Sequence, residues 1–110
     1  MSKTIRFTHN EKEYTLEYTR ESVKRMERSG FDIDELTNKP ATMIPMLFAG
    51  AFIAHHQGVK NEKIEKIYDG IGGKQKLLKA LIEMYNETIE TLFSDEMGNE
   101  DWTPSWEMTD

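Results

Sequence analysis

One uncharged stretch decides the fold: Thr42-Met43-Ile44-Pro45-Met46-Leu47-Phe48-Ala49-Gly50-Ala51-Phe52-Ile53-Ala54-His55-His56. It lies in the only long segment without a formal charge, residues 40–59, of a chain in which 31% of the residues are charged. A helix that is apolar on every side is normally buried on every side. Its apolar part would span only about 18 Å, roughly half of a bilayer crossing. We therefore predict a soluble core helix over residues 42–56 and no association with a membrane.

Three positions in this helix carry more specific expectations. Thr42 is predicted to cap it, which places Pro45 in the first turn, where no backbone donor is needed. Gly50 should destabilise a helix interior by about 1 kcal/mol relative to alanine. We therefore expect another element to pack closely against Gly50.

Composition limits the classes of protein that fit. At 110 residues and 12.8 kDa the chain suits a single domain. It contains no cysteine, which excludes disulfides, thiolate metal sites and cysteine nucleophiles. The first residues lack the apolar segment of a secretory signal, so we expect an intracellular protein.

The net charge of −6 is concentrated at one end of the chain. Residues 94–110 hold six acidic side chains and no basic one, whereas residues 1–93 are balanced. We call residues 94–110 the acidic segment; it also holds Trp102 and Trp106, and its composition predicts a flexible tail. A neutral body with an acidic end gives no electrostatic reason to bind phosphate backbones, so nucleic acid is not an expected partner.

The N-terminal residues predict a β-hairpin over residues 4–18. Residues 4–8 and 13–18 alternate polar and apolar side chains in the strand period, and a polar turn, residues 9–12, separates them. A two-stranded hairpin is marginal alone. Its apolar face must therefore pack on helices, or the hairpin must pair with another subunit, and this second alternative would give a homo-oligomer.

Three further helices are predicted around the central one. A helix over 19–29 starts at a Thr19 cap, turns Val23 and Met26 inward and stops at Gly30. A helix over 61–69 is predicted to start at an Asn61 cap. The clearest apolar periodicity predicts a helix over 74–93 that packs on the central helix. Residues 31–36 fit either an extended segment or a single helical turn.

Together these elements predict an α+β fold. The N-terminal hairpin packs on a small bundle of about four helices in one domain over residues 1–93. The acidic segment follows as a flexible tail.

Three motifs resemble ligand-binding sites, but each also has a simpler structural interpretation. His55-His56 lacks a third ligand at a suitable spacing, so we interpret it as the polar end of an apolar helix, not as a metal site. Residues 70–74 are glycine-rich but follow a helix and lack a Lys-Ser/Thr pair, so we interpret them as a hinge and not a phosphate loop. Asp32 and Asp34 lack the remaining residues of a calcium loop.

No catalytic, cofactor or metal site is predicted, and the chain is not expected to be an enzyme. The six residues predicted to contact a partner combine adaptable methionine side chains with large aromatic rings, which are common anchors at interfaces. They are Met43, Met46, Phe48, Phe52, Trp102 and Trp106. For the two tryptophans, docking on the chain's own domain is the alternative.

The sequence resembles a family of proteins of this length from tailed bacteriophages and prophages of Gram-positive bacteria. The likeness is carried by residues 14–20, Gly30-Phe31, residues 39–52, His55-His56, residues 80–85 and Trp102. In size and composition it also resembles the small tail assembly chaperones of phages with long, non-contractile tails.

This resemblance implies a binding function in the host cytoplasm. A tail assembly chaperone would bind the helical tape measure protein, the tail tube protein, or both, during tail morphogenesis. No catalytic residues come with the resemblance. The alternative is a structural tail or head-tail connector component of the virion.

Overall fold

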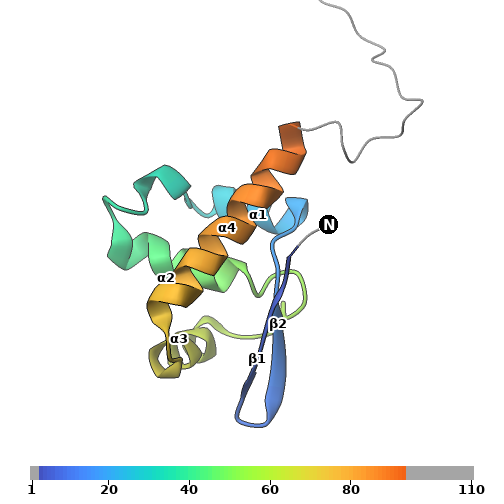
Figure 1. The fold of residues 1–110 in the computed structure, drawn as a ribbon, viewed down its shortest axis with the longest axis vertical. Helices are drawn as coiled ribbons and strands as arrows, with labels where there is room; N and C mark the ends of the chain where they lie inside the picture. The colour runs from blue at the N-terminus through green and yellow to red at the C-terminus, as the bar shows by residue number, and fades with distance from the viewer. Residues whose placement is uncertain (1–2, 94–110) are drawn as a thin grey trace, which may run out of the picture.

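The computed structural model describes residues 3–93, which form an N-terminal hairpin followed by four α-helices (Figure 1). The predicted α+β fold is thereby confirmed, while the acidic segment lies outside the described residues. The elements are β1 (Ile5–His9), β2 (Lys12–Leu16), α1 (Arg20–Arg28), the 3₁₀ turn η1 (Ile33–Glu35), α2 (Pro40–Gly50), α3 (Asn61–Gly70) and α4 (Lys74–Phe93).

The hairpin has the register that the alternating pattern requires. Its strands are antiparallel, and Ile5 lies opposite Leu16 while Phe7 lies opposite Tyr14, so the apolar side chains share one face. The two turn residues, Asn10 and Glu11, both have left-handed backbone conformations, with φ of 49° and 66°. Two such residues are characteristic of the type I′ turn, whose twist suits a two-residue hairpin loop.

Helix α1 begins and ends where its sequence signals predict. The Thr19 hydroxyl accepts a hydrogen bond from the backbone N–H of Ser22, and the Ser22 hydroxyl accepts one from the N–H of Thr19, which forms a capping box. Val23 and Met26 are buried. After the helix, Gly30 has φ of 101°, the left-handed stop that was expected.

The segment after α1 forms a single helical turn, which decides between the two alternatives left open by its sequence. The Asp32 carboxylate accepts a hydrogen bond of 2.9 Å from the N–H of Asp34 and caps η1. Asp32 is thus used as a cap.

The central helix is shorter than predicted and starts earlier. Helix α2 begins at Pro40 and ends at Gly50, so Thr42 is not its cap and Pro45 lies inside it. The prediction of a helix to residue 56 was wrong, because the chain turns after Gly50 and the carbonyl of Ala51 accepts a hydrogen bond from Glu17 in the hairpin. The prediction that Asn61 caps α3 was also wrong. Lys60 occupies the cap position, and its side chain makes no capping hydrogen bond.

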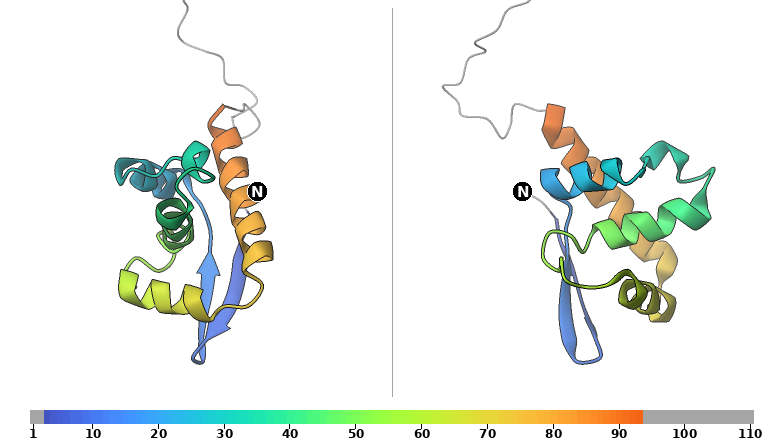
Figure 2. Two further views of the ribbon diagram at one scale, coloured as in Figure 1. Left: turned by 90° about the vertical axis from the view of Figure 1, so that its left-hand side faces the viewer. Right: turned by 180° about the vertical axis from the view of Figure 1, so that it is seen from behind.

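Helix α2 is the centre of the core, as its apolar composition predicts. It packs against α1, α3 and α4, and Leu47, Phe48 and Phe52 from this region are almost completely buried. Helix α4 runs from α3, near the hairpin tip, to the far end of the body beside α1 (Figures 1 and 2). Its packing on α2 confirms the expected helix pair. Among residues 3–93, no helix combines the length and apolar character needed to cross a membrane.

Gly50 allows α1 to approach α2 closely. A side-chain carbon at this position would lie only 2.3 Å from Sδ and 2.5 Å from Cε of Met26. Gly50 is buried, and Met26 is 3% exposed. The close packing predicted at Gly50 is therefore confirmed, with Met26 as the neighbour.

The residues after α2 cover the outer edge of β2. The backbone N–H of Glu17 donates to the carbonyl of Ala51 at 3.0 Å, and that of Thr15 donates to Nε2 of His56, also at 3.0 Å. Nε2 of His55 lies 2.6 Å from the carboxylate of Glu17. Thr15 and Glu17 are therefore partly buried.

Replacing Glu11 by glycine should stabilise the hairpin. A left-handed conformation costs a residue with a Cβ about 1–2 kcal/mol, and glycine adopts it freely. We expect Glu11→Gly to raise the free energy of unfolding by about 0.5–1 kcal/mol in urea denaturation. Asn10→Gly is the matched control and should change it less, since asparagine tolerates this conformation. A destabilised Glu11→Gly variant would contradict the turn geometry.

Acid should weaken the fold through His56. The pKa of His56 is lowered from 6.5 by burial and by the positive charges of Lys12 and His55, and its Nε2 accepts a hydrogen bond only when unprotonated. The unfolded chain therefore takes up the proton first as the pH falls. We expect the free energy of unfolding to fall between about pH 7 and 5, with a slope below about 1.4 kcal/mol per pH unit from this group.

The control for this pH dependence is His56→Gln, whose amide oxygen can accept the same hydrogen bond without titrating. Urea unfolding across the pH range should show a smaller decline in this variant, whereas His55→Gln should keep most of it. If the free energy of unfolding falls equally with pH in the wild type and in His56→Gln, His56 is not the group that makes the fold sensitive to acid.

Substitutions at Gly50 and Met26 should have strongly non-additive effects on the free energy of unfolding. Gly50→Ala adds a methyl group where Met26 lies, and overpacking of a core typically costs about 1–3 kcal/mol. In a Met26→Ala background that clash is gone, and the better helix propensity of alanine should make the same change neutral or stabilising by up to about 1 kcal/mol. A double-mutant cycle by urea denaturation measures this difference; additive effects would contradict the contact.

Candidate functional site: a methionine-lined groove and a basic pocket

Three of the predicted contact residues lie in the core of the domain. Met43, Phe48 and Phe52 are 6%, 1% and 1% exposed. Their assignment as contact residues is corrected, because α2 packs against α1, α3 and α4, and Phe52, which follows α2, packs on Phe7 and Tyr14 of the hairpin. Met46 is partly exposed. Trp102 and Trp106 lie outside the described residues.

The partly exposed Met46 lines a groove between α1 and α2. The groove has a volume of about 530 Å³ and an apolar floor, and its rim carries two arginines from the last turn of α1. Its lining residues are Met26, Met46, Ala49, Gly50 and Ile53 on the floor, with Arg25, Arg28, Ser29 and Asn61 around them.

The groove exists because of the local sequence of both helices. Gly50 carries no side chain, so the Met26 thioether lies directly against α2 and closes the bottom of the groove. Arg25 and Arg28 are exposed at the C-terminal end of α1, where positive charge is favourable. Neither arginine forms an ion pair within residues 3–93. The groove can therefore take an apolar side chain flanked by acidic groups.

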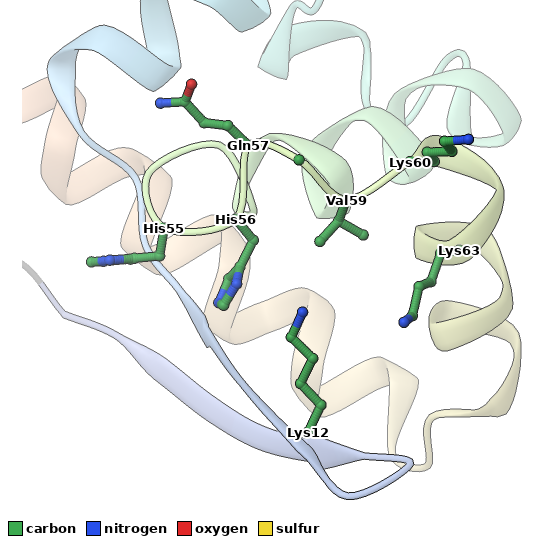
Figure 3. A pocket seen from close by; sticks show the side chains of 8 residues that line it. Lys12, His55, His56, Gln57, Val59, Lys60 and Lys63 are labelled. Carbon is green, nitrogen blue, oxygen red and sulfur yellow. The ribbon is translucent and has the colours of Figure 1, made fainter.

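A second hollow lies between the hairpin tip and the start of α3. It has a volume of about 520 Å³. Figure 3 shows Lys12 from the hairpin, His56 from the turn after α2 and Lys63 from α3 pointing into it, whereas His55 and Gln57 point away. Gly58, Val59 and Lys60 complete its lining. We call this hollow the basic pocket.

A hydrogen bond from the backbone determines the tautomer of the neutral His56 ring. Its Nε2 accepts the N–H of Thr15 at 3.0 Å, so a neutral ring carries its proton on Nδ1. The ring packs edge-on against Tyr14, and the Lys12 ammonium lies 5.4 Å from the centre of the same tyrosine ring. His56 therefore presents a donor, and its surroundings are cationic.

Both histidines have partners in the hairpin. Within residues 3–93, no group of three histidine or acidic side chains is placed to hold a metal ion. His55 is paired with Glu17 and His56 with the β2 backbone. The two residues lie beyond the end of α2 and contact the hairpin, a role that the interpretation as a polar helix end did not include.

The other two motifs have structural roles. The Lys74 ammonium donates to the carbonyls of Asp69 and Ile71, at 3.2 and 3.0 Å, so it closes the C-terminal end of α3. Gly73 has φ of 66° and supplies the left-handed turn into α4. The prediction of a hinge at residues 70–74 fits this arrangement.

The buried phenols contribute hydrogen bonds and packing. Burial raises the pKa of Tyr18 well above its usual value and raises that of Tyr85 to about 12, with further contributions from nearby charges. Both therefore stay protonated at neutral pH. The Tyr18 hydroxyl donates to the carbonyl of Leu47 at 2.6 Å.

Sequence reasoning missed both hollows. The rim arginines and the three lysines were recognisable only as exposed charges, because they come from separate elements whose approach depends on the tertiary fold. The one local signal was Gly50, which predicted a close approach without identifying α1 as its neighbour.

Comparison with known proteins gives a family without an assigned activity. The model of the family described as "Domain of unknown function (DUF5055)" matches residues 1–106. No curated protein and no solved structure matches the chain. Because the match spans nearly the whole sequence, the chain belongs to the DUF5055 family.

Proposed function

We propose that this chain is a tail assembly chaperone of a tailed phage or prophage and acts in the host cytoplasm. It binds the tape measure protein, the tail tube protein, or both, while the tail is assembled. The sequence resemblance suggests this class, and the groove between α1 and α2 is the observation that carries the proposal.

The groove has the properties that reversible binding of a helical partner requires. Met46 is partly exposed and has an unbranched, polarisable side chain that repacks around different apolar groups, above a floor closed by the buried Met26. Two antiparallel or crossing helices form a natural cradle for an amphipathic third helix, which inserts apolar anchors into such a groove. Arg25 and Arg28 on the rim favour a partner with acidic residues beside its anchors.

The proposal assigns binding, without catalysis, to the chain. The groove offers methionine, alanine and isoleucine side chains, and its charged groups are the guanidinium groups of two arginines. These groups suit recognition of a polypeptide surface.

A structural component of the tail or of the head-tail connector is the second candidate. The hairpin favours it, because β1 pairs only with β2 in the described sheet. The turn after α2 covers the β2 edge, so a second copy of the chain would add a strand at β1. This arrangement would also produce a homo-oligomer, one of the two alternatives that the sequence left open for the hairpin.

A charge placed in the groove should weaken partner binding. We expect Met46→Lys to weaken binding to the co-expressed tape measure protein at least about tenfold, because it removes an apolar contact and places an unpaired ammonium against the partner's apolar anchor. Ile44→Lys is the matched control, since Ile44 is also partly exposed on α2 but does not line the groove. Binding is measured by affinity pull-down and titration calorimetry, with thermal unfolding as the folding check.

Equal binding by wild type and Met46→Lys would exclude the groove as the contact site. Mass spectrometry of purified virions separates the two candidates. A chaperone should be missing from the particle, whereas a tail or connector component should be present at a fixed copy number.

A further inference from the structure

The basic pocket presents hydrogen-bond donors and positive charge from three separate elements. Lys12 and Lys63 point into it from the hairpin and from α3 (Figure 3). His56 adds an N–H, because its Nε2 already accepts the backbone of Thr15. A site with only donors is suited to oxygen anions.

The positive charge of this pocket is not balanced locally. No acidic side chain lines it. Within residues 3–93, none of its three lysines forms an ion pair, since the ion pairs there involve Lys3 and His55. Bringing like charges together is unfavourable without a counter-charge, so an anionic ligand would relieve this repulsion.

The positive surface is elongated. A neighbouring hollow of about 320 Å³ shares Lys60 and Lys63 with the basic pocket and adds His9 and Lys66, with Glu62 as its single acid. We call the two hollows together the basic strip. Its length suits several carboxylates spaced along a peptide better than a single compact anion.

The chain itself contains a segment of the complementary chemistry. Residues 94–110 carry six acidic side chains and no basic one, whereas the body has equal numbers of both. We propose that the acidic segment, from the same chain or from a second copy, binds the basic strip through its carboxylates. This inference is independent of the groove and of the function proposed for it.

The segment is long enough to reach the strip within one chain. Helix α4 has 20 residues and is about 30 Å long. The strip lies along the start of α3, a helix about 15 Å long, and α4 begins beyond the end of α3, so the path from Phe93 to the strip is about 45 Å along both helices. Residues 94–107 span up to roughly 46 Å when extended, so within one chain Glu107 and Asp110 can reach the strip, whereas the acids closer to Phe93 can reach only the strip of a second copy.

Tryptophan fluorescence of the full chain tests this proposal, because Trp102 and Trp106 are its only tryptophans. Acrylamide quenching should increase roughly twofold or more when high salt screens the contact. The charge-reversed variant Lys12→Glu/Lys63→Glu should already show the high quenching at low salt. Lys24→Glu/Lys39→Glu is the control with the same charge change at exposed positions outside both hollows, and it should behave like the wild type.

Amide NMR shifts locate the contact. Replacing the six acids by their amides in the full chain should shift the signals of Lys12, His56 and Lys63. The replaced residues are Asp95, Glu96, Glu100, Asp101, Glu107 and Asp110. If these shifts depend on protein concentration, the acidic segment comes from a second copy. If they do not, it comes from the same chain. Both results support the proposal.

Three results would overturn the inference. The first is no shift at the basic strip. The second is a shift centred on Arg25 and Arg28, which would place the acidic segment in the groove. The third is that the amide signals of the strip shift when inorganic phosphate is added but do not shift when the six acids are replaced by amides.

Discussion

The outer edge of β2 determines how the middle of the chain is arranged. Two of its backbone N–H groups would lack acceptors in an isolated hairpin, and unpaired amides shielded from water are unfavourable. The Ala51 carbonyl and the His56 ring supply those acceptors. To do so, the chain must leave the helical path after Gly50. The same bonds hold His56 in one tautomer and bring it beside Lys12, so the basic pocket results from completing the hairpin.

Tyr18 connects the end of the hairpin to the helices. Its hydroxyl donates to the carbonyl of Leu47 in α2 at 2.6 Å, and its own carbonyl accepts the Thr88 hydroxyl of α4 at 3.2 Å. Its ring meets that of Tyr85 edge-on, with 5.5 Å between the centroids. Each buried hydrogen bond contributes about 1 kcal/mol net. One residue thus orients the sheet against the two helices that form the core.

The features predictable from sequence are those set by neighbouring residues. The Thr19 cap, the Gly30 stop and the strand alternation depend on contacts a few positions apart and were recognised, although the caps predicted from equally local signals at Thr42 and Asn61 were wrong. The end of α2 was missed because its cause, the bond between Glu17 and Ala51, joins residues far apart in the chain. For the same reason Met43, Phe48 and Phe52 were mistaken for contact residues: composition identifies apolar side chains but does not say how many neighbours cover them.

The volume of the groove helps to decide between the two proposed roles, a chaperone and a structural component of the tail or connector. Most large apolar side chains of residues 3–93 are used in the core, and about 530 Å³ remains for a partner between α1 and α2. That volume holds a few anchoring side chains, whereas stable assemblies bury roughly 800 Å² on each partner. A contact restricted to a few anchors dissociates readily. Ready release is needed by a chaperone that leaves its client. A permanent connector would need a broader surface, and the edge of β1, which pairs only with β2 in the described sheet, could supply it only by recruiting further copies.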